Sequence, residues 1–383
     1  MMQLLYRRWS DAACSKPNPK RQRGTSPPAN ILEKIRHRWS RLACAFGWAL
    51  NDSPFGEMRI VKTAWGALVV SVCFMSTVAQ AVAQAPKESP ETLLLVVGAP
   101  GAAEFEEEFL EAAEQWEKLA ESRKWDLVRI DQANGDITAR EQLKSSVEKN
   151  AAAPRLWIVM LGHGTFSRNV AKFNLVGPDV SSKELKSWLA PVNSQIVLIN
   201  CSSASAPFVP ELADPKRIVL TATKSGSEYN YARFGKYFAK AASDLKNDID
   251  HDKEVSLLEA FLAASDEVER FYQQAGRLST EHALLNDNGD KAGTTADFYR
   301  GIRPAKESLE GKIDGALAAR IILISSPEAI EFPKELEARR SAVEAEIDKL
   351  RSRKSFLAEN DYLDQLEKLM LQLAELYDNA EEK

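Results

Sequence analysis

Short apolar runs alternate with amphipathic stretches along the middle of this chain. Apolar residues at helical spacing, such as Phe105, Phe109 and Trp116, predict a helix after the first run. The runs themselves are rich in Leu, Ile and Val and are short enough to be strands. They cover residues 93–97, 127–130, 156–161, 195–199 and 218–222. Repeated strand–helix alternation predicts an α/β fold with a mostly parallel central sheet and helices on both faces.

Two capping boxes mark where connecting helices begin. Thr138 and Glu141 open one helix before the third apolar run, and Ser181 and Glu184 open another before the fourth. Each predicted strand of this central part is therefore followed by a helix that leads to the next strand.

The last part of the chain has a different pattern. Pro327 and Pro333 interrupt it, and Leu residues then recur at near-heptad spacing on both sides of a polar break at residues 352–360. Two charged amphipathic helices with a short connection are typical of a helical hairpin, predicted here for residues 327–383. Such a hairpin packs on the preceding domain, self-associates or binds a partner protein, and the pattern leaves these alternatives open.

Composition separates two oppositely charged parts. The 383 residues are 44% hydrophobic and 27% charged, enough for one large domain with appendages. Residues 1–85 hold 12 Lys and Arg against 4 Asp and Glu, so the formal charge of −5 leaves −13 on the remainder. An acidic mature protein is a poor candidate for binding nucleic acid or an anionic membrane. Gly98 and Gly101 do not complete a dinucleotide-binding fingerprint, so that cofactor class is excluded as well.

The amino-terminal part divides into a basic extension at residues 1–57 and a signal peptide at residues 58–85. The second part begins with Met58, continues through an apolar run of about 15 residues and ends in alternating alanines. Because roughly 20 residues are needed to span a bilayer, the run favours cleavage and export to the periplasm or the medium. Translation from Met58 is the simplest account of the extension, which is otherwise expected to be disordered. The alternative is an uncleaved N-terminal membrane anchor.

Only Cys201 remains after this cleavage, so no intramolecular disulfide forms in the exported protein. Cys201 follows the fourth apolar run, and His163 follows the third within a Gly-His-Gly sequence. Since the carboxyl ends of parallel strands form the ligand-binding crevice of such sheets, we expect the imidazole to lie beside the thiol. A thiolate attacks a carbonyl carbon, and the imidazole takes the thiol proton and later protonates the leaving amine. This arrangement is typical of a cysteine hydrolase, and the alternative is a buried strand-end cysteine with a loop histidine.

Small residues surround both side chains. Gly164 leaves the backbone beside His163 uncrowded, so its N–H and that of Cys201 are candidate donors for an oxyanion hole. Residues 201–205 are Cys-Ser-Ser-Ala-Ser, which lets a peptide lie close to the nucleophile. A serine hydrolase that uses one of these serines is a weaker hypothesis, because the Gly-x-Ser-x-Gly nucleophile elbow is absent.

The order of strand, His-Gly, helical connection, strand and Cys-x-Ser-x-Ser resembles the caspase-like cysteine peptidases, most closely their legumain-like branch. The similarity covers approximately residues 93–290. It implies a caspase-like three-layer sandwich with His163 as general base, Cys201 as nucleophile and a protein or peptide substrate. It also implies an oxyanion hole from the N–H groups of Gly164 and Cys201, and chemistry that requires no cofactor. Two positions depart from the family pattern. Legumain-like sequences usually have Gly where this chain has Ala204, and the residue before the nucleophile, here Asn200, is more often Ala.

The same resemblance implies that the segment after the fifth apolar run lines the pocket for the substrate side chain that precedes the cut. The candidate substrate-binding residues are Thr223, Lys224, Ser225 and Glu228. Lys224 or Glu228 would set the charge preference of this pocket. The alternative is that both are solvated loop charges.

Residues 248–259 place oxygen-bearing side chains at the spacing of an EF-hand loop, between two predicted amphipathic helices at residues 231–242 and 256–272. The candidate ligands are Asp248, Asp250, Asp252, Ser256 and Glu259. Lys253 occupies the sixth position of the loop, where the sharp turn favours glycine. The loop is therefore either a structural Ca²⁺ site or a degenerate loop that caps the following helix.

Together these features predict an exported cysteine endopeptidase in which Cys201 attacks and His163 is the base. The alternative belongs to another class of protein. It is a catalytically silent caspase-like scaffold or binding module of the cell envelope that acts through its C-terminal hairpin. Labelling of Cys201 by a thiol-directed probe, compared with a denatured control, distinguishes the two hypotheses.

Overall fold

The computed structural model describes residues 90–306 and 312–381 of the chain. The expected basic extension at residues 1–57 and the expected signal peptide at residues 58–85 lie outside these residues. Within the described ranges, every helix is too short or too polar to cross a membrane.

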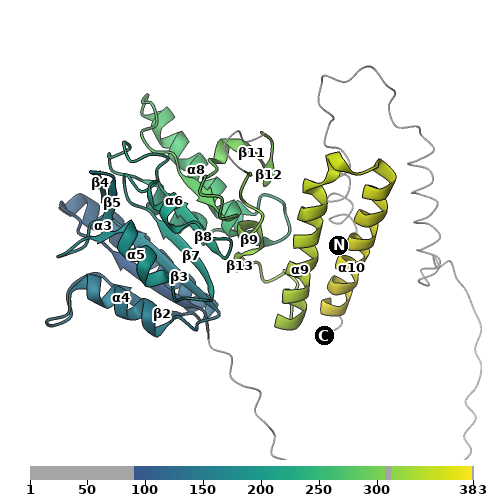
Figure 1. Cartoon of the computed structure of the whole chain (residues 1–383), viewed down its shortest axis with the longest axis horizontal. Coiled ribbons are helices and arrows are strands. Elements are labelled where there is room, and N and C mark those ends of the chain that lie inside the picture. The colour runs from purple at the N-terminus through teal and green to yellow at the C-terminus, as the bar shows by residue number, and fades with distance from the viewer. Residues whose placement is uncertain (1–89, 307–311, 382–383) are drawn as a thin grey trace, which may run out of the picture. The chain divides into compact units, whose positions relative to one another are not determined.

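A six-stranded sheet forms the centre of the domain (Figure 1). Its strands are β1 (Thr92–Val97), β2 (Asp126–Ile130), β3 (Arg155–Leu161), β7 (Gln195–Asn200), β8 (Arg217–Thr221) and β10 (Leu284–Asn286). They lie in the order β10-β8-β7-β3-β1-β2, and every neighbouring pair is parallel except β10 with β8. The five predicted strands and the mostly parallel sheet are therefore confirmed. The sixth strand, β10, has only three residues, too few for an apolar pattern to be recognised.

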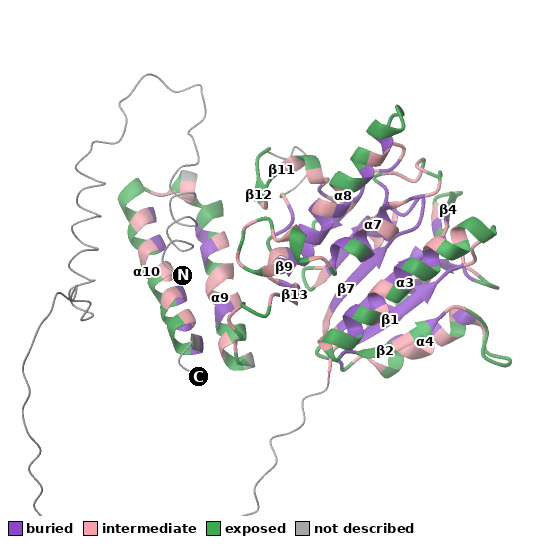
Figure 2. Cartoon of the chain, turned by 180° about the vertical axis from the view of Figure 1, so that it is seen from behind, coloured by how far each residue is buried: buried purple, intermediate pink, exposed green. Residues whose placement is uncertain are grey.

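Helices cover both faces of this sheet (Figures 1 and 2). One face packs against α3 (Ala103–Arg123), α7 (Phe234–Ala241) and α8 (Leu257–Gln274), and the other against α4 (Ala139–Lys149), α5 (Ser182–Leu189) and α6 (Phe208–Leu212). Successive residues of β1 alternate between the two cores: Leu93 and Leu95 face the first group of helices, and Leu94 and Val96 face the second. Both predicted capping boxes open their helices, α4 and α5. The expected three-layer α/β architecture is confirmed.

Smaller elements lie in the connections between these helices and strands. A three-stranded antiparallel sheet follows β3 and consists of β4 (Gly164–Ser167), β5 (Val170–Phe173) and β6 (Val180–Ser181). Two further strand pairs are β9 (Glu254–Ser256) with β13 (Ile322–Ser325), and β11 (Tyr299–Arg300) with β12 (Arg303–Pro304). Short 3₁₀ helices are η1 (Leu245–Asn247), η2 (Ala296–Phe298), η3 (Ala318–Arg320) and η4 (Lys354–Phe356). None of these short strands was predicted, because two to four residues carry too little hydrophobic periodicity.

The chain ends in two long helices, α9 (Lys334–Ser352) and α10 (Glu359–Glu381), which contact each other and form the expected hairpin. Arg340 of α9 reaches β9, where its Nη2 lies 2.7 Å from Glu254 Oε2. The rings of Phe332 and Tyr377 lie 5.0 and 5.6 Å from the same guanidinium group. A buried arginine with a carboxylate and two aromatic faces therefore joins the hairpin to the domain. The exact domain boundary expected at residues 326 and 327 stays a prediction.

Candidate functional site

Two loops meet at the carboxyl edge of the central sheet. The loop after β3 contains His163, and the loop after β7 contains Cys201. The parallel ladder continues one residue past β7, because Cys201 N–H donates to Met160 O at 2.9 Å. A Cβ atom added to Gly164 would lie only 2.6 Å from Ser202 Oγ, so this position requires glycine. The structure thus brings together the two loops that the sequence singled out.

His163 is half-buried and held in a defined orientation. Its Nε2 lies 3.0 Å from Pro100 O. A carbonyl oxygen only accepts hydrogen bonds, so Nε2 carries the proton and Nδ1 of the neutral ring keeps its lone pair. The rings of Phe105 and Phe109 pack against the imidazole with centroids 4.9 and 5.3 Å away. The arrangement suits a base that acts through Nδ1.

Cys201, the one cysteine among the described residues, points into the protein core instead of toward solvent. The residue is 3% exposed and belongs to the same apolar cluster as Val197 and Ile199 of β7. A Cβ atom added to Gly235 at the start of α7 would lie 3.3 Å from Cys201 Sγ. Burial raises the pKa of the Cys201 thiol well above its ordinary value, and the charge of Glu281 raises it further. The thiol therefore stays protonated at neutral pH in this conformation.

The structure also differs from the expected oxyanion hole. The N–H group of Cys201 is occupied by the ladder bond to Met160, so it does not face a ligand. The N–H group of Gly164 faces Ser203 Oγ at 3.5 Å. The physical reason is that the parallel ladder extends beyond the last strand residue and uses the donor that the prediction had assigned to the oxyanion.

Hydroxyl groups next to Cys201 are buried as well. Ser202 is fully buried and its Oγ donates to Asn200 Oδ1 at 2.6 Å. Ser205 is fully buried and its hydroxyl lies 3.2 Å from Thr223 Oγ1. Neither hydroxyl has a hydrogen bond to His163 among the bonds of the described residues, so the structure gives no support to a serine nucleophile.

The four candidate substrate-binding residues do not share one environment. Thr223 is fully buried, and its Oγ1 accepts a hydrogen bond from Ala206 N–H. The carboxylate of Glu228 is turned inward, where Oε2 accepts from Lys224 N–H and Oε1 lies 2.6 Å from His282 Nδ1. The side chains of Lys224 and Ser225 reach solvent. Of the two residues expected to set a charge preference, Lys224 is therefore the accessible one.

Sequence reasoning missed Glu281, a buried carboxylate near the thiol. It is 2% exposed, and its two oxygens accept from Arg233 N–H and Phe234 N–H, each at 3.0 Å. Burial raises the pKa of Glu281 to about 7, although these backbone donors oppose the shift. Its partners lie 47 and 48 residues earlier in the chain, so no short-range spacing signals the contact.

The acidic loop brings together three of its five expected ligands. Carboxylate oxygens of Asp248, Asp250 and Asp252 lie within 4.8 Å of one another, an arrangement that could hold an ion. Glu259 and Ser256 are not part of this cluster. Glu259 Oε2 accepts from Ser256 N–H and Oγ, both at 2.8 Å, as the capping box of α8. Their expected role as ligands is thus corrected: both residues cap the helix that follows the loop.

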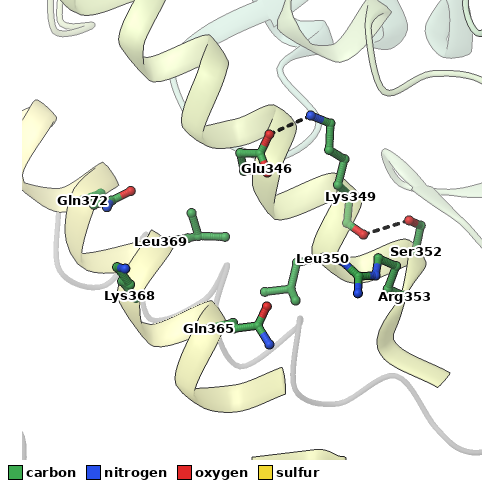
Figure 3. A pocket seen from close by; sticks show the side chains of 9 residues that line it. All are labelled: Glu346, Lys349, Leu350, Ser352, Arg353, Gln365, Lys368, Leu369 and Gln372. Atoms are coloured by element: carbon green, nitrogen blue, oxygen red, sulfur yellow. Dashed lines mark hydrogen bonds and ion pairs between the residues drawn. The ribbon is translucent and has the colours of Figure 1, made fainter. Parts of the chain in front are cut away.

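A separate pocket of about 470 Å³ lies in the C-terminal hairpin (Figure 3). Leu350 and Leu369 lie between the two helices, and cationic groups surround them. One of these, Lys349 Nζ, is paired with Glu346 at 2.6 Å. The hairpin therefore offers a pocket with both apolar and charged lining residues.

Comparisons with known proteins were made for the whole chain. No known protein family matches the sequence, and no curated protein is similar to it. Among solved structures, the Drosophila initiator caspase Dronc matches at 14% identity with a TM-score of 0.33, over 53% of this chain and 81% of that one. Caspase-1 from Spodoptera frugiperda matches at 7% identity with a TM-score of 0.35, over 52% of this chain and 87% of that one. The legumain-like branch stays a prediction.

Proposed function

We propose that this protein is a caspase-like domain that binds a protein or peptide without cutting it. The observation that carries the proposal is the position of Cys201. Its thiol packs among apolar side chains, has a raised pKa and lies against Gly235 instead of in an open crevice. A nucleophilic cysteine needs an accessible thiolate, and this environment opposes both accessibility and ionisation.

Two surfaces are available for such binding. One is the carboxyl edge of the central sheet, where His163 is half-buried and Lys224 is exposed. The other is the hairpin, whose pocket carries Lys349, Arg353 and Lys368 around an apolar floor. Self-association through α9 and α10 and binding of a partner protein are both compatible with this surface. Export after cleavage near Ala85 is part of the proposal and rests on the signal-peptide pattern alone.

A second candidate function is a cysteine endopeptidase with His163 and Cys201 as its two catalytic residues. The observation in its favour is the hydrogen bond between His163 Nε2 and Pro100 O, which leaves Nδ1 free to accept a proton. In this mechanism Nδ1 takes the Cys201 proton, the sulfur attacks the carbonyl carbon, and the leaving amine receives the proton. The thiol must first become accessible to solvent, which requires movement of the residues that cover it.

Peptide hydrolysis separates the two candidates. The parent protein, Cys201→Ala and His163→Ala are incubated with a proteome-derived peptide library, and new termini are identified by mass spectrometry. A binding module produces no new termini in any of the three samples. Cleavage by the parent that both substitutions abolish, without additive losses in the double variant, would establish the peptidase and overturn the proposal.

A further inference from the structure

The segment between β8 and α7 lies across the loops of the candidate site. We refer to residues 228–233 as the strap. Its Glu228 O accepts a hydrogen bond from Ala204 N–H at 2.8 Å, in the loop that follows Cys201. Its Tyr231 ring lies 5.8 Å from the His163 ring and 4.6 Å from the Phe105 ring. The strap thus contacts both loops at the carboxyl edge of the sheet.

Two adjacent residues hold the two ends of the strap. At the first end His282 Nδ1 lies 2.6 Å from Glu228 Oε1, and the same carboxylate accepts from His282 N–H at 3.2 Å. At the second end Glu281 accepts from Arg233 N–H and Phe234 N–H. Because Glu281 and His282 are neighbours in the chain, one displacement of their loop would break the contacts at both ends together. Tyr231 and Arg233 of the strap also contact Glu108 of α3.

Between these ends the strap contributes only Tyr231 and Ala232 to the hydrophobic core. Of residues 228–233 only Ala232 is buried, and Tyr229 is 76% exposed. The residues just before the two holding residues are exposed or half-buried as well, and Leu278 is 90% exposed. A segment held by polar contacts, with few buried apolar groups, opens at a small fraction of the free energy of global unfolding.

We propose that the strap is a lid over the carboxyl edge, and that Glu281 and His282 form a two-point latch that releases it as one unit. Opening exposes the His163 loop and the serine-rich loop after Cys201 to an incoming peptide. The identity of the ligand rests on the proposed function, whereas the opening itself does not.

The ionisation state of Glu281 affects how readily the lid opens. The groups that face Glu281 are Arg233 at the end of the strap, Tyr272 of α8, and Cys201 and Tyr231 on the side of the site. An ionised carboxylate is a stronger acceptor for the strap N–H groups than a protonated one. Burial outweighs this gain and raises the pKa of Glu281 to about 7, so protonation in mild acid favours the closed latch and ionisation at higher pH favours its release.

Hydrogen–deuterium exchange of the full chain, followed by mass spectrometry, tests whether the two ends of the strap open together. Glu281→Gln replaces one of the two accepting oxygens at the second end with an NH₂ group. The diagnostic amides are those of Lys224 and Ala204, which donate to Glu228 at the first end and do not touch Glu281. Exchange there is expected to accelerate at least tenfold. The reciprocal variant His282→Ala is expected to accelerate exchange at Phe234. Asp287→Asn is the matched control, since Asp287 is another buried carboxylate that accepts backbone N–H groups, from Gly315 and Ala318.

The outcomes are distinct. Acceleration confined to the end next to each substitution overturns the two-point latch, as does equal acceleration in Asp287→Asn. If Glu281→Gln does not fold, Tyr231→Phe removes the hydrogen bond to Glu108 Oε2 at 2.5 Å and provides the same readout at Ala204. Peptide cleavage by the parent protein would overturn the proposed function and leave the lid in place, whereas unchanged exchange would overturn the lid alone.

Discussion

Cys201 and Glu259 are equally inaccessible, each 3% exposed, but they are buried for opposite reasons. The Cys201 side chain is surrounded by apolar groups and by the backbone of Gly235. The Glu259 carboxylate accepts hydrogen bonds from Ile249 N–H, Asp250 N–H and both donors of Ser256. Packing keeps the thiol protonated, and hydrogen bonding holds the carboxylate in place. In both cases the side chain is committed to the fold and is unavailable to a ligand.

This difference predicts which substitutions will destabilise the protein most. Removal of a hydrogen-bonded carboxylate leaves buried donors without partners, and each of these costs about 1–3 kcal/mol. Removal of a small apolar group costs only its packing. Substitutions in the two regions should therefore lower the free energy of unfolding by different amounts.

Among the single substitutions, the largest effect is expected at the Glu259 carboxylate. Glu259→Ala leaves the N–H groups of Ile249, Asp250 and Ser256 without their acceptor, and should lower the free energy of unfolding by roughly 3–4 kcal/mol. Glu269→Ala, on the exposed face of the same helix, is the control and should change stability by less than about 0.5 kcal/mol. Urea denaturation measures both. Similar small changes in the two variants would show that the carboxylate is not a structural cap.

A smaller effect is expected where the thiol packs. Gly235→Ala places a methyl group 2.7 Å from Cys201 Cβ and should destabilise the protein by about 1–3 kcal/mol. Cys201→Gly removes the obstructing atoms, so the double variant should be more stable than the sum of the single changes predicts. Additive losses in this double-mutant cycle would mean that the thiol does not lie against α7.

The fold was largely predictable because its signals are local. Apolar runs and capping boxes act over a few residues, and these marked the five long strands and the starts of α4 and α5. The small sheet of β4 to β6 gave no such signal. Its hairpin turns at Arg168 and Asn169, with φ values of 50° and 62°, a conformation in which Asn is common but Arg is not.

The candidate site was predictable only as far as its loops. Strand order brings His163 and Cys201 to the same edge, and this follows from the alternation of strands and helices. The direction of the Cys201 side chain depends on how far the β7 ladder continues, which one sequence does not specify. Contacts between residues far apart in the sequence could not be predicted either. Examples are the hydrogen bond from Phe234 N–H to Glu281 and the contact of His163 with Pro100 O.

A pH series tests the same difference between packing and hydrogen bonding at Glu281. This carboxylate accepts backbone hydrogen bonds, as Glu259 does, and it lies near Cys201. Burial raises the pKa of Glu281 to about 7, and that of Asp314 to about 7 as well. The folded state therefore binds these protons more tightly than the unfolded state, in which the pKa values are about 4. Stability should fall as pH rises from about 4 to about 7, by up to roughly 1.4 kcal/mol per pH unit for each group, and then level off. Glu281→Gln and Asp314→Asn should each flatten the part of the slope due to their own group, and an unchanged slope in both would remove this explanation.

The smallest effect is expected from calcium at Asp248, Asp250 and Asp252. Without the bidentate carboxylate of Glu259 the site has three acidic ligands, so we expect millimolar affinity and a rise in melting temperature of about 2–4 °C at 10 mM calcium. Asp250→Asn should abolish the rise, because it removes a charge from the cluster and no helix cap. Lys253→Gly should enlarge it, since Lys253 has a φ of 74°, a conformation that glycine adopts without strain. Magnesium at the same concentration controls for ionic strength. An equal melting curve with calcium, magnesium and chelator, in the parent and in Lys253→Gly, would leave the loop as the cap of α8 and nothing more.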